Sequence, residues 1–497
     1  MLKVLITAIC LLALVINTNA QTWNKLGPGS SSDINGFINV VCTDIHGNIY
    51  VAGDIEDDSG SSSVYKWNGT VWTELGHGST AVNPRSVEID AIFVDNSDNV
   101  YAAAAHYDSL TLNTDFYIAK WNGTTWNQLG TGSNTLYAYD ISVITGDRLG
   151  NVYAVGGFVD SLNGTYVAKW DGANWSEVGT GSNRLNANSY INTISIDTLN
   201  NIFVAGTFTD GLTDTDGNLY VAKWNGTSWS ELGSGICAPF ANVIQIFSVL
   251  ADPKGNLYAT GSLSVDSADY VSKWNGSSWD ELGTGIHALN ANTCIFSLCE
   301  DPSGNLYAAG AFTDTSTDIT VPPYSGVIHP NYVAKWDGTN WSELGTGTNA
   351  LNANDYIMSV CSDNSGNIYA GGVFTDTTVT FTIFDTTYFD SVPTIHTYYA
   401  HPSYVARYGV PTTSVTQIQI NNSINVYPNP TSDELNITGI TENTNYRLLN
   451  VTGVCVQNGI LHSGSNTMIM GNIAAGVYVL ELTDGEGRRD IVRVVKE

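Results

Sequence analysis

The phrase Tyr166-Val-Ala-Lys-Trp170-Asp-Gly-Ala-Asn-Trp175-Ser-Glu-Val-Gly179 decides the fold, because close copies of it return through about the first four hundred residues. The turn inside each copy is Asn-Gly or Asp-Gly, and the six turns start at Asn68, Asn122, Asp171, Asn225, Asn275 and Asp337. This dipeptide accepts positive φ at both central positions of a type I′ turn, whose twist suits the flanking strands. The phrase therefore predicts six β-hairpins with two-residue loops.

The tryptophans of this phrase are predicted to lie on one face of each hairpin. A two-residue loop makes Trp121 face Thr124 and Ala119 face Trp126, so that the two indoles are diagonal neighbours. All 13 tryptophans of the chain occupy these two positions. We interpret them as packing between sheets rather than as a surface on which a ligand stacks.

Three short markers recur in fixed order at a period near fifty residues. The Trp-x-x-Leu-Gly marker starts at Trp23, Trp72, Trp126, Trp175 (with Val178 in place of Leu), Trp229, Trp279 and Trp341. The Gly-Asn-x-Tyr marker is centred on Asn48, Asn99, Asn151, Asn201, Asn256, Asn305 and Asn367. The Lys-Trp marker ends at Trp67, Trp121, Trp170, Trp224, Trp274 and Trp336, and Arg407-Tyr408 takes its place in the last repeat.

Each repeat divides into four expected strands: an apolar stretch opened by Ile (strand a), Tyr-Ala-Ala-Gly-x-Phe (b), Tyr-Val-Ala-Lys-Trp (c) and Trp-x-x-Leu-Gly (d). Four antiparallel strands in forty to fifty residues are typical of a β-propeller blade. The d strand at Trp23 has no a, b or c strand before it, whereas the seventh repeat ends after its c strand. We therefore predict an all-β chain with a seven-bladed β-propeller over residues 21–410, closed by the N-terminal strand pairing near Tyr404.

The connections between strands b and c vary in length. The two longest belong to the sixth and seventh repeats, which carry residues 315–331 and 377–402 on the same face of the predicted ring. Large insertions on a rigid scaffold commonly hold binding residues. The candidate binding residues are the aromatic and histidine side chains of these insertions: Tyr324, His329, His396, Tyr398, Tyr399 and His401.

The composition is that of an acidic, exported protein. Lys+Arg 18 against Asp+Glu 47 gives a net charge of -29, which repels nucleic acid and anionic membranes and favours cations and neutral partners. Residues 1–20 have the pattern of a signal peptide, with Lys3, an apolar run of about thirteen residues and small residues before Ala20. The run is too short to span a bilayer. We expect cleavage after Ala20 and an exported, monomeric chain without a transmembrane segment.

Six cysteines remain after Ala20. Cys42, Cys299 and Cys361 hold equivalent positions in their repeats, which predicts small buried residues with free thiols. Cys237 and Cys294 fall in successive connections, so a disulfide between them stays open as an alternative. The sequence holds no CxxC motif and no His/Cys cluster with the spacing of a metal site.

The most regular polar residue is an Asp four positions before each marker Asn. These residues are Asp44, Asp95, Asp147, Asp197, Asp252, Asp301 and Asp363. Seven equivalent copies indicate turn capping rather than catalysis. Asp214, Asp216 and Asn218 alternate like calcium ligands but lack the distal Glu, so the alternatives are weak Ca2+ binding and a bare polar turn. No nucleophile elbow, phosphate loop or zinc motif occurs, and no catalytic residue or other cofactor is assigned.

Residues 411–422 form a Thr-, Gln- and Asn-rich linker, and residues 423–497 a smaller unit with short β runs, expected to be a β-sandwich. Its motifs are Asn425-Val-Tyr-Pro428-Asn429-Pro430, Leu435-Asn-Ile437, Gly476-Val-Tyr478-Val-Leu480 and Arg489-Asp-Ile-Val-Arg493-Val-Val-Lys496. In this order and place, the unit resembles the type A C-terminal sorting domain of the type IX secretion system.

This resemblance implies a Gram-negative bacterium and an exported protein. The sorting signal would be carried by Pro428, Asn429, Pro430, Arg493 and Lys496. The chain would pass through the periplasm, meet the type IX secretion machinery and be cleaved in the linker. It would then be released, or be attached to lipopolysaccharide at the outer-membrane surface.

The remaining four fifths of the chain resemble a broad group of repeats in secreted bacterial proteins, which carries no agreed activity. Two functions stay open. The first is a non-catalytic binding, adhesion or scaffold protein that recognises a glycan or a protein through the two large insertions. The alternative is a secreted polysaccharide-degrading enzyme with paired carboxylates in the propeller channel. The evenness of the repeats favours the first.

Overall fold

A computed structural model describes residues 21–26, 36–55, 61–77, 82, 89–108, 113–136, 138–159, 164–185, 187–209, 219–233, 243–263, 269–314, 319–320, 327–375, 403–409, 425–441, 443–450, 455–483 and 489–496. The expected signal peptide and linker lie outside these ranges. The chain forms two compact units, Met1–Pro411 and Thr412–Glu497, each of which is described by itself.

The first unit contains seven four-stranded antiparallel sheets within the described residues. We name the strands of each sheet a to d. Strands a are β2 (Gly36–Thr43), β6 (Ile92–Val94), β10 (Ile141–Gly146), β14 (Ile191–Ile196), β18 (Val243–Ala251), β22 (Ile295–Glu300) and β28 (Ile357–Ser362). Strands b are β3 (Ile49–Ile55), β7 (Val100–Asp108), β11 (Val152–Gly156), β15 (Ile202–Gly206), β19 (Leu257–Leu263), β23 (Leu306–Gly310) and β29 (Ile368–Gly372).

The outer strands carry the Lys-Trp and Trp-x-x-Leu-Gly markers. Strands c are β4 (Tyr65–Trp67), β8 (Asn113–Trp121), β12 (Ala168–Trp170), β16 (Val221–Trp224), β20 (Val271–Trp274), β26 (Ala334–Trp336) and β30 (Ala406–Gly409). Strands d are β5 (Trp72–Glu74), β9 (Trp126–Gln128), β13 (Trp175–Glu177), β17 (Trp229–Leu232), β21 (Trp279–Glu281), β27 (Trp341–Glu343) and, in the last sheet, β1 (Thr22–Lys25). We number the sheets 1 to 7 by their a strands.

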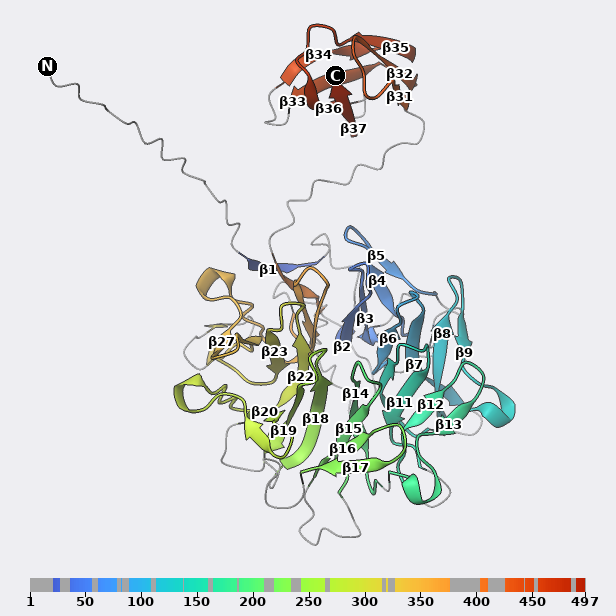
Figure 1. Cartoon of the computed structure of the whole chain (residues 1–497), viewed down its shortest axis with the longest axis vertical. Helices are drawn as coiled ribbons and strands as arrows, with labels where there is room; N and C mark the ends of the chain where they lie inside the picture. The colour runs from blue at the N-terminus through green and yellow to red at the C-terminus, as the bar shows by residue number, and fades with distance from the viewer. Residues whose placement is uncertain are drawn as a thin grey trace, which may run out of the picture. The chain divides into compact units, whose positions relative to one another are not determined.

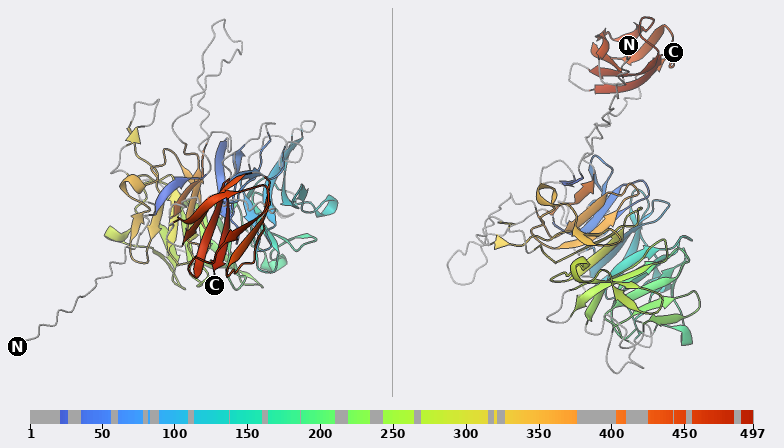
Figure 2. Two further views of the ribbon diagram at one scale, coloured as in Figure 1. Left: turned by 90° about the horizontal axis from the view of Figure 1, so that it is seen from above. Right: turned by 60° about the vertical axis from the view of Figure 1, so that its left-hand side comes forward.

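The sheets are arranged as a β-propeller. Consecutive a strands contact one another, and β28 of sheet 7 contacts β2 of sheet 1, so the contacts form a cycle. Each junction holds its own buried apolar cluster, including one that joins Ile38 and Val51 of sheet 1 to Tyr369 and Val405 of sheet 7. In Figure 1 the colour of this unit accordingly passes from blue through green and yellow to orange around the sheets, and Figure 2 shows them from two further directions.

The N-terminal strand pairs with the last c strand, as the repeat pattern predicts. Trp23 lies opposite Tyr408 and Lys25 opposite Ala406 in the β1–β30 ladder. The next residue, Leu26, continues the pairing, because its N–H donates to the Val405 carbonyl at 2.9 Å. The edge of sheet 7 is therefore covered by the other end of the same unit.

The pairing inside the c–d hairpins differs from the predicted one. Trp121 lies opposite Trp126, and Ala119 lies opposite Gln128. The indoles are therefore direct cross-strand neighbours rather than diagonal ones, and their ring centroids are 5.4 Å apart. The same direct Trp pair occurs in the first six sheets.

The physical reason is the Asn side chain at the start of the turn. Asn122 Oδ1 accepts hydrogen bonds from Thr124 N at 2.9 Å and from Thr125 N at 2.8 Å, while Asn122 N donates to the Thr125 carbonyl. The loop is thus Gly123-Thr124, shifted by one residue from the predicted Asn-Gly. Gly123 has a φ of +99° and Asn122 does not have a positive φ, which excludes the type I′ turn.

The Trp-x-x-Leu-Gly marker joins neighbouring sheets. Trp175 Nε1 donates to the Leu129 carbonyl of the preceding sheet at 3.0 Å. The equivalent bonds run from Trp23 to Leu344, Trp126 to Leu75, Trp229 to Val178, Trp279 to Leu232 and Trp341 to Leu282. Gly130 has a φ of +77°, and a Cβ there would lie 3.0 Å from Trp175 Cδ1. The interpretation of the tryptophans as packing between sheets is therefore confirmed.

The second unit is two sheets packed over one core. One sheet has the order β31 (Asn425–Tyr427), β32 (Glu434–Ile440), β35 (Gly464–Ile469), and the other the order β34 (Cys455–Leu461), β33 (Thr444–Asn450), β36 (Gly476–Thr483), β37 (Arg489–Lys496). Leu435 and Ile437 of the first sheet and Leu448, Leu480 and Val494 of the second are fully buried in the shared cluster. This is the sandwich arrangement that the sequence predicts.

Candidate functional site

The two ends of the propeller ring differ in what they carry. Strands a and b are antiparallel and joined by short Asp-x-x-Gly-Asn turns, so these turns and the c–d hairpins share one end, which we call the turn end. The starts of strands a and the b-to-c connections share the opposite end, which we call the loop end. For example, Ile141 at the start of β10 lies opposite Gly156 at the end of β11.

At the turn end, each regular Asp is committed to its own turn. Asp301 Oδ1 accepts Ser303 N and Asn305 N, both at 2.9 Å, while Oδ2 accepts Asn305 Nδ2 at 2.7 Å and the Tyr307 hydroxyl at 2.9 Å. Burial alone would raise the pKa of Asp301, but these hydrogen bonds outweigh it and hold that pKa below its ordinary value. The prediction that these aspartates shape turns is confirmed, because the backbone N–H bond to the Asp Oδ1 recurs in all seven sheets.

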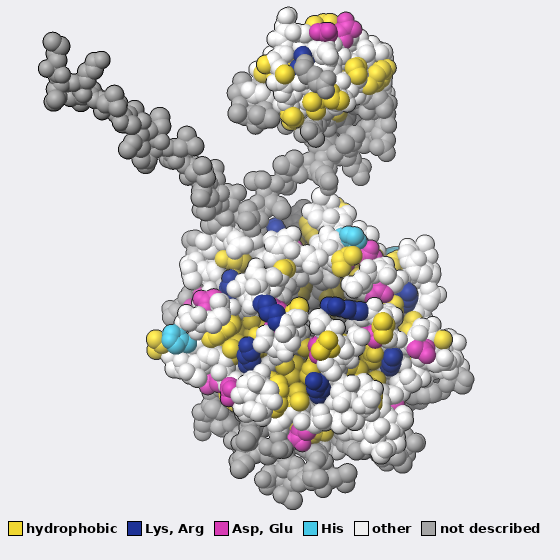
Figure 3. Space-filling view, viewed as in Figure 1, with side chains coloured by type: hydrophobic (Ala, Val, Ile, Leu, Met, Phe, Trp, Pro, Cys, Tyr) yellow, Lys and Arg dark blue, Asp and Glu magenta, His cyan; other side chains and the backbone are white. Residues whose placement is uncertain are grey.

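A ring of cations covers these turns. In sheet 1, Lys66 Nζ lies 5.0 Å from the Tyr50 ring centroid and 3.9 Å from the fully buried side chain of Asp44. The equivalent lysines over an aromatic ring are Lys120, Lys169, Lys223, Lys273 and Lys335. Figure 3 shows Lys and Arg side chains encircling the middle of the propeller unit on the face in view. The cations therefore gather at the same end as the turn aspartates, which are buried in sheets 1, 5, 6 and 7 and partly buried in sheets 2, 3 and 4.

At the loop end, strand a carries a β-bulge just after its first Ile. The unpaired bulge residue is Asn39, Ser142, Asn192, Phe247, Phe296 and Met358 in sheets 1, 3, 4, 5, 6 and 7. Asp90 follows the corresponding Ile89 in sheet 2. Bulges free a side chain from the ladder and re-aim it. We call these seven residues the bulge ring; its members are polar in sheets 1 to 4 and apolar in sheets 5 to 7.

The apolar part of the bulge ring forms a chain of touching aromatic rings. Phe247 and Phe296, from neighbouring sheets, meet edge to face with centroids 5.3 Å apart. Phe296 in turn meets Tyr356, the residue before the first Ile of sheet 7, at 6.1 Å. Phe247 and Phe296 are partly buried, and Tyr356 is 49% exposed. This aromatic arc therefore presents ring surface to solvent across three sheets.

The polar part offers hydrogen-bonding groups. Asn39 Nδ2 donates to Asp90 Oδ1 of the next sheet at 3.1 Å. In sheet 3, Ser142 Oγ donates to Asp140 Oδ2 at 2.8 Å. In sheet 4, the buried Oδ1 of Asn192 has no hydrogen-bond partner among the described residues. An unpaired buried acceptor is costly and calls for an explanation, such as a ligand donor. We call these residues the polar arc.

A carboxylate with a raised pKa lies at the loop end of sheet 6. Glu343, the last residue of β27, pairs with Ala334 at the start of β26. Burial, and then the charge of Asp314, raise the pKa of Glu343 to about 7. Burial together with both carboxylates also raises the pKa of Tyr332 to about 12. Since Glu74, Glu177, Glu231 and Glu281 hold equivalent places in other d strands, this acid belongs to the repeat.

The predicted binding residues are only partly described. His329 is exposed and follows β25 (Val327–Ile328), which pairs with β24 (Ile319–Thr320) inside the sixth-sheet insertion. Tyr324, His396, Tyr398, Tyr399 and His401 lie outside the described residues, and so do the predicted calcium ligands Asp214, Asp216 and Asn218. No group of three or more potential metal ligands occurs among the described side chains. The cysteines Cys42, Cys294, Cys299, Cys361 and Cys455 are free thiols, and Cys237 lies outside the described residues.

Sequence reasoning missed the bulge ring, although a signal was present. The position after each opening Ile changes from polar to apolar between sheets 4 and 5, where the rest of the repeat is nearly constant. The bulge itself, which frees that position for function, is set by strand pairing and leaves no separate mark in the sequence.

In the second unit, the Pro-Asn-Pro motif contacts the last strand. Asn429 Oδ1 accepts the Val495 N–H at 2.8 Å, and Thr431 N donates to the Val495 carbonyl at 2.9 Å. Thr431 also forms a parallel bridge with Lys496, so the two ends of this unit lie together. The peptide bonds before Pro428 and Pro430 are cis. The backbone of Arg493 pairs with Val479 in the β36–β37 ladder. The predicted sorting residues thus lie on two neighbouring segments: Pro428, Asn429 and Pro430 between β31 and β32, and Arg493 and Lys496 on β37.

The fold and this terminal unit define an exported β-propeller with a C-terminal sorting module. Residues 425–497 match the family described as the secretion system C-terminal sorting domain, which confirms the resemblance seen in the sequence. The sorting domain marks the chain for export to the cell surface or for secretion. Among the described residues, no helix is long and apolar enough to cross a membrane.

Solved structures give more distant similarities. PorZ, a bacterial surface component of the type IX secretion system of Porphyromonas gingivalis, has 14% identity and a TM-score of 0.47, with 95% of this chain and 60% of that chain covered. The extracellular domain of a putative hybrid two-component system from B. thetaiotaomicron has 13% identity and a TM-score of 0.45, with 96% and 57% covered.

A GH74 enzyme of Niastella koreensis has 12% identity and a TM-score of 0.47, with 95% of this chain and 80% of that chain covered. The chain spans 60% and 57% of the lengths of the first two proteins. None of these similarities assigns an activity to this chain. Comparison with curated proteins returns no match.

Proposed function

We propose that this chain is a type IX-sorted β-propeller of seven blades that binds an extracellular glycan at its loop end without transforming it. The observation that carries the proposal is the bulge ring, in which neighbouring sheets place an aromatic arc opposite a polar arc at one end of the same ring. In this proposal residues 1–20 are removed as a signal peptide, β1 closes the ring, and residues 411–422 link the propeller to the sorting domain.

The chemistry of the two arcs suits a sugar. A pyranose ring has an apolar face of C–H groups and an equatorial belt of hydroxyls. Phe247, Phe296 and Tyr356 supply flat apolar surface from three consecutive sheets. Asn192 and Asp90 supply an amide and a carboxylate that exchange hydrogen bonds with hydroxyls. Sites of this kind combine apolar walls with a few placed polar groups.

The position of the arcs also fits the longest connections of the chain. The aromatic arc belongs to sheets 5 to 7, and the two large insertions follow strands b of sheets 6 and 7 at the same end. His329, in the first insertion, is exposed at that end. The predicted role of the insertions in binding therefore remains a proposal, in which they extend the aromatic arc outwards.

A glycan array probed with the mature chain, which is the chain without residues 1–20, tests this function. We expect binding to neutral oligosaccharides, and we expect Phe296→Ala to weaken it at least tenfold, about 1.4 kcal/mol, because the variant removes the central ring of the arc. Leu199→Ala is the matched control, since Leu199 is 80% exposed in an a–b turn at the opposite end. An array without any bound glycan, or equal binding by Phe296→Ala and the native chain, contradicts the proposal.

The alternative function is a polysaccharide-degrading enzyme, and one observation favours it as a second candidate. Asp90 and Asp140 bring carboxylates from adjacent sheets 2 and 3 to the loop end. Glycosidic cleavage uses two such groups. Release of reducing ends from a bound polysaccharide, abolished in Asp90→Asn and Asp140→Asn, would support this candidate; intact polysaccharide after prolonged incubation supports binding alone.

A further inference from the structure

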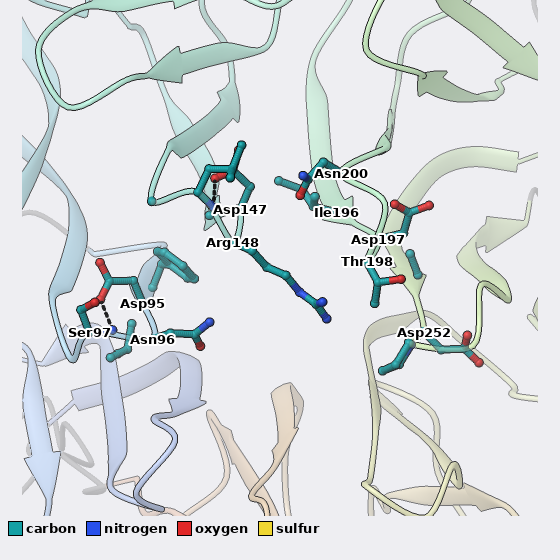
Figure 4. A pocket seen from close by; sticks show the side chains of 17 residues that line it. Asp95, Asn96, Ser97, Asp147, Arg148, Ile196, Asp197, Thr198, Asn200 and Asp252 are labelled. Carbon is teal, nitrogen blue, oxygen red and sulfur yellow. Dashed lines mark hydrogen bonds between the residues drawn. The ribbon is translucent and has the colours of Figure 1, made fainter.

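A separate cavity lies at the turn end of the ring. It has a volume of about 430 Å³ and is lined by the a–b turns of sheets 2 to 5. Its size is in the range that holds small ligands. Figure 4 shows Arg148, from the turn between β10 and β11, extending across this cavity toward Thr198 and Asp252. The cavity and the bulge ring are at opposite ends, so they are two different sites.

Arg148 stands out from its equivalents in the other turns. It directly follows the turn aspartate, and four residues in that position line the cavity, namely Asn96, Arg148, Thr198 and Pro253. The other six turns carry Ile45, Asn96, Thr198, Pro253, Pro302 and Asn364 there. Because none of these is charged, the cationic side chain is not part of the repeated turn architecture. A role confined to one turn is the mark of a site rather than of the scaffold.

The guanidinium of Arg148 has no ion pair or hydrogen bond among the described residues, although carboxylates line the same cavity. Four carboxylates line it, those of Asp95, Asp147, Asp197 and Asp252, and each accepts hydrogen bonds from within its own turn rather than from Arg148. Asp147 accepts Leu149 N, Asn151 N, Asn151 Nδ2 and the Tyr153 hydroxyl at 2.6 to 3.0 Å. Asp252, 2% exposed, accepts Lys254 N, Asn256 N and Asn256 Nδ2 in the same way. In a chain with 47 acidic residues, an arginine left unpaired in a cavity is free to receive an external anion.

The surroundings add selectivity for a hydroxylated anion. Asn96, Ser97, Thr198 and Asn200 line the cavity with amide and hydroxyl groups. Lys120, Lys169 and Lys223 belong to the ring of cations in sheets 2 to 4. Their positive charge, together with that of Arg148, offsets at this end of the ring the four aspartates that line the cavity. A neutral sugar would leave the guanidinium without a partner and would gain less.

We propose that this cavity binds an acidic sugar, whose carboxylate or phosphate pairs with Arg148 and whose hydroxyls bond to the amide and hydroxyl side chains of the turns. The planar guanidinium fork suits both groups, because each presents two oxygens to it. The site is independent of the loop-end arcs. It gives the exported propeller a second specificity, for anionic saccharide, on its opposite face.

Calorimetry on the mature chain tests this site with three probes: glucuronate, glucose 6-phosphate and methyl glucoside. We expect the two anions, or one of them, to bind and the neutral sugar not to bind. The carboxylate and phosphate arms identify which anionic group the cavity prefers. Arg148→Gln should weaken anion binding at least tenfold, whereas Arg148→Lys should retain part of it.

Lys254→Gln is the matched control. It removes one positive charge from an a–b turn, but Lys254 is engaged with Glu300 at 3.8 Å. The control should bind the anions like the native chain, and the urea midpoint of Arg148→Gln should be unchanged because its side chain is exposed. The proposal is overturned if neither anion binds, if Lys254→Gln and Arg148→Gln lose binding equally, or if the neutral sugar binds as well as the anions.

Discussion

Replacing Trp23 by Ala tests whether the N-terminal strand closes the propeller. Trp23 faces Tyr408 across the β1–β30 ladder, with ring centroids 5.4 Å apart. Its Nε1 donates to the Leu344 carbonyl of sheet 6 at 2.7 Å. It also packs on the buried cluster that joins sheets 6 and 7. Trp23 therefore links sheet 7 to Leu344 of sheet 6, which is 321 positions away in the sequence.

The expected cost follows from burial and from the hydrogen bond. Truncating a fully buried Trp to Ala costs about 3 to 5 kcal/mol. Trp23 is only partly buried, so we expect the free energy of unfolding of the propeller to fall by about 2 to 3 kcal/mol. About 1 kcal/mol of this belongs to the indole hydrogen bond, and Trp23→Phe should lose that part and some of the ring packing, so its cost should be smaller than that of Trp23→Ala.

Urea unfolding followed by tryptophan fluorescence is the assay. All 13 tryptophans lie between positions 23 and 341, so the signal reports the propeller and not the sorting domain. Trp175→Ala, which removes the equivalent indole between sheets 2 and 3, should cost a similar amount. Leu199→Ala, at an 80% exposed position, should cost nothing measurable. If Trp23→Ala unfolds at the same urea concentration as Leu199→Ala while Trp175→Ala is destabilised, the N-terminal strand does not stabilise the propeller.

Three further predictions concern titration and the sorting domain. The lowered pKa of Asp301 stabilises the fold above its unfolded value of about 3.9 and loses that effect as the pH falls through the folded pKa, so Asp301→Ala should flatten the acid limb of the urea midpoint between pH 5 and 2. Burial and the charge of Asp314 raise the pKa of Glu343 to about 7, so its effect on stability has the opposite sign. The stabilisation is complete below the ordinary pKa of 4.5 and is lost as the pH rises through 7. Glu343→Gln should therefore stabilise the propeller by about 1 kcal/mol at pH 8 and leave its stability unchanged at pH 4. Asn429→Ala removes the acceptor of the Val495 N–H and should destabilise the isolated 425–497 unit by about 1 kcal/mol in thermal unfolding, whereas the exposed Ile460→Ala should not.

Much of the fold could be predicted because the pattern of markers that defines a four-stranded sheet occurs seven times in the sequence. The tryptophan and asparagine markers located the four strands of each sheet, and the unmatched strand at Trp23 predicted the pairing that the structure shows with Tyr408. The register of the c–d hairpins could not be predicted by the same route. The dipeptide rule assigns Asn-Gly to the loop, but the side chain of Asn122 replaces a backbone acceptor and moves the loop to Gly123-Thr124.

The candidate site was harder to predict than the fold. The candidate binding residues were taken from the two longest insertions, and the structure describes only His329 among them. The bulge ring and Arg148 both sit inside the regular repeat, where an exceptional residue is easily taken for ordinary variation. Their meaning depends on which repeats become neighbours and on which end of the ring each position occupies, and both are properties of the assembled sheets.

The most direct test of the loop-end site is a comparison of two variants with two ligands. The affinity of a neutral oligosaccharide selected on the array is measured by calorimetry for the native chain, Phe296→Ala and Arg148→Gln, and the measurement is repeated with the preferred acidic sugar. We expect Phe296→Ala to bind the neutral glycan at least tenfold more weakly and Arg148→Gln to bind it with native affinity, because the aromatic arc and the cavity lie at opposite ends of the ring. Loss of the neutral glycan in Arg148→Gln, with normal binding by Phe296→Ala, would contradict this expectation.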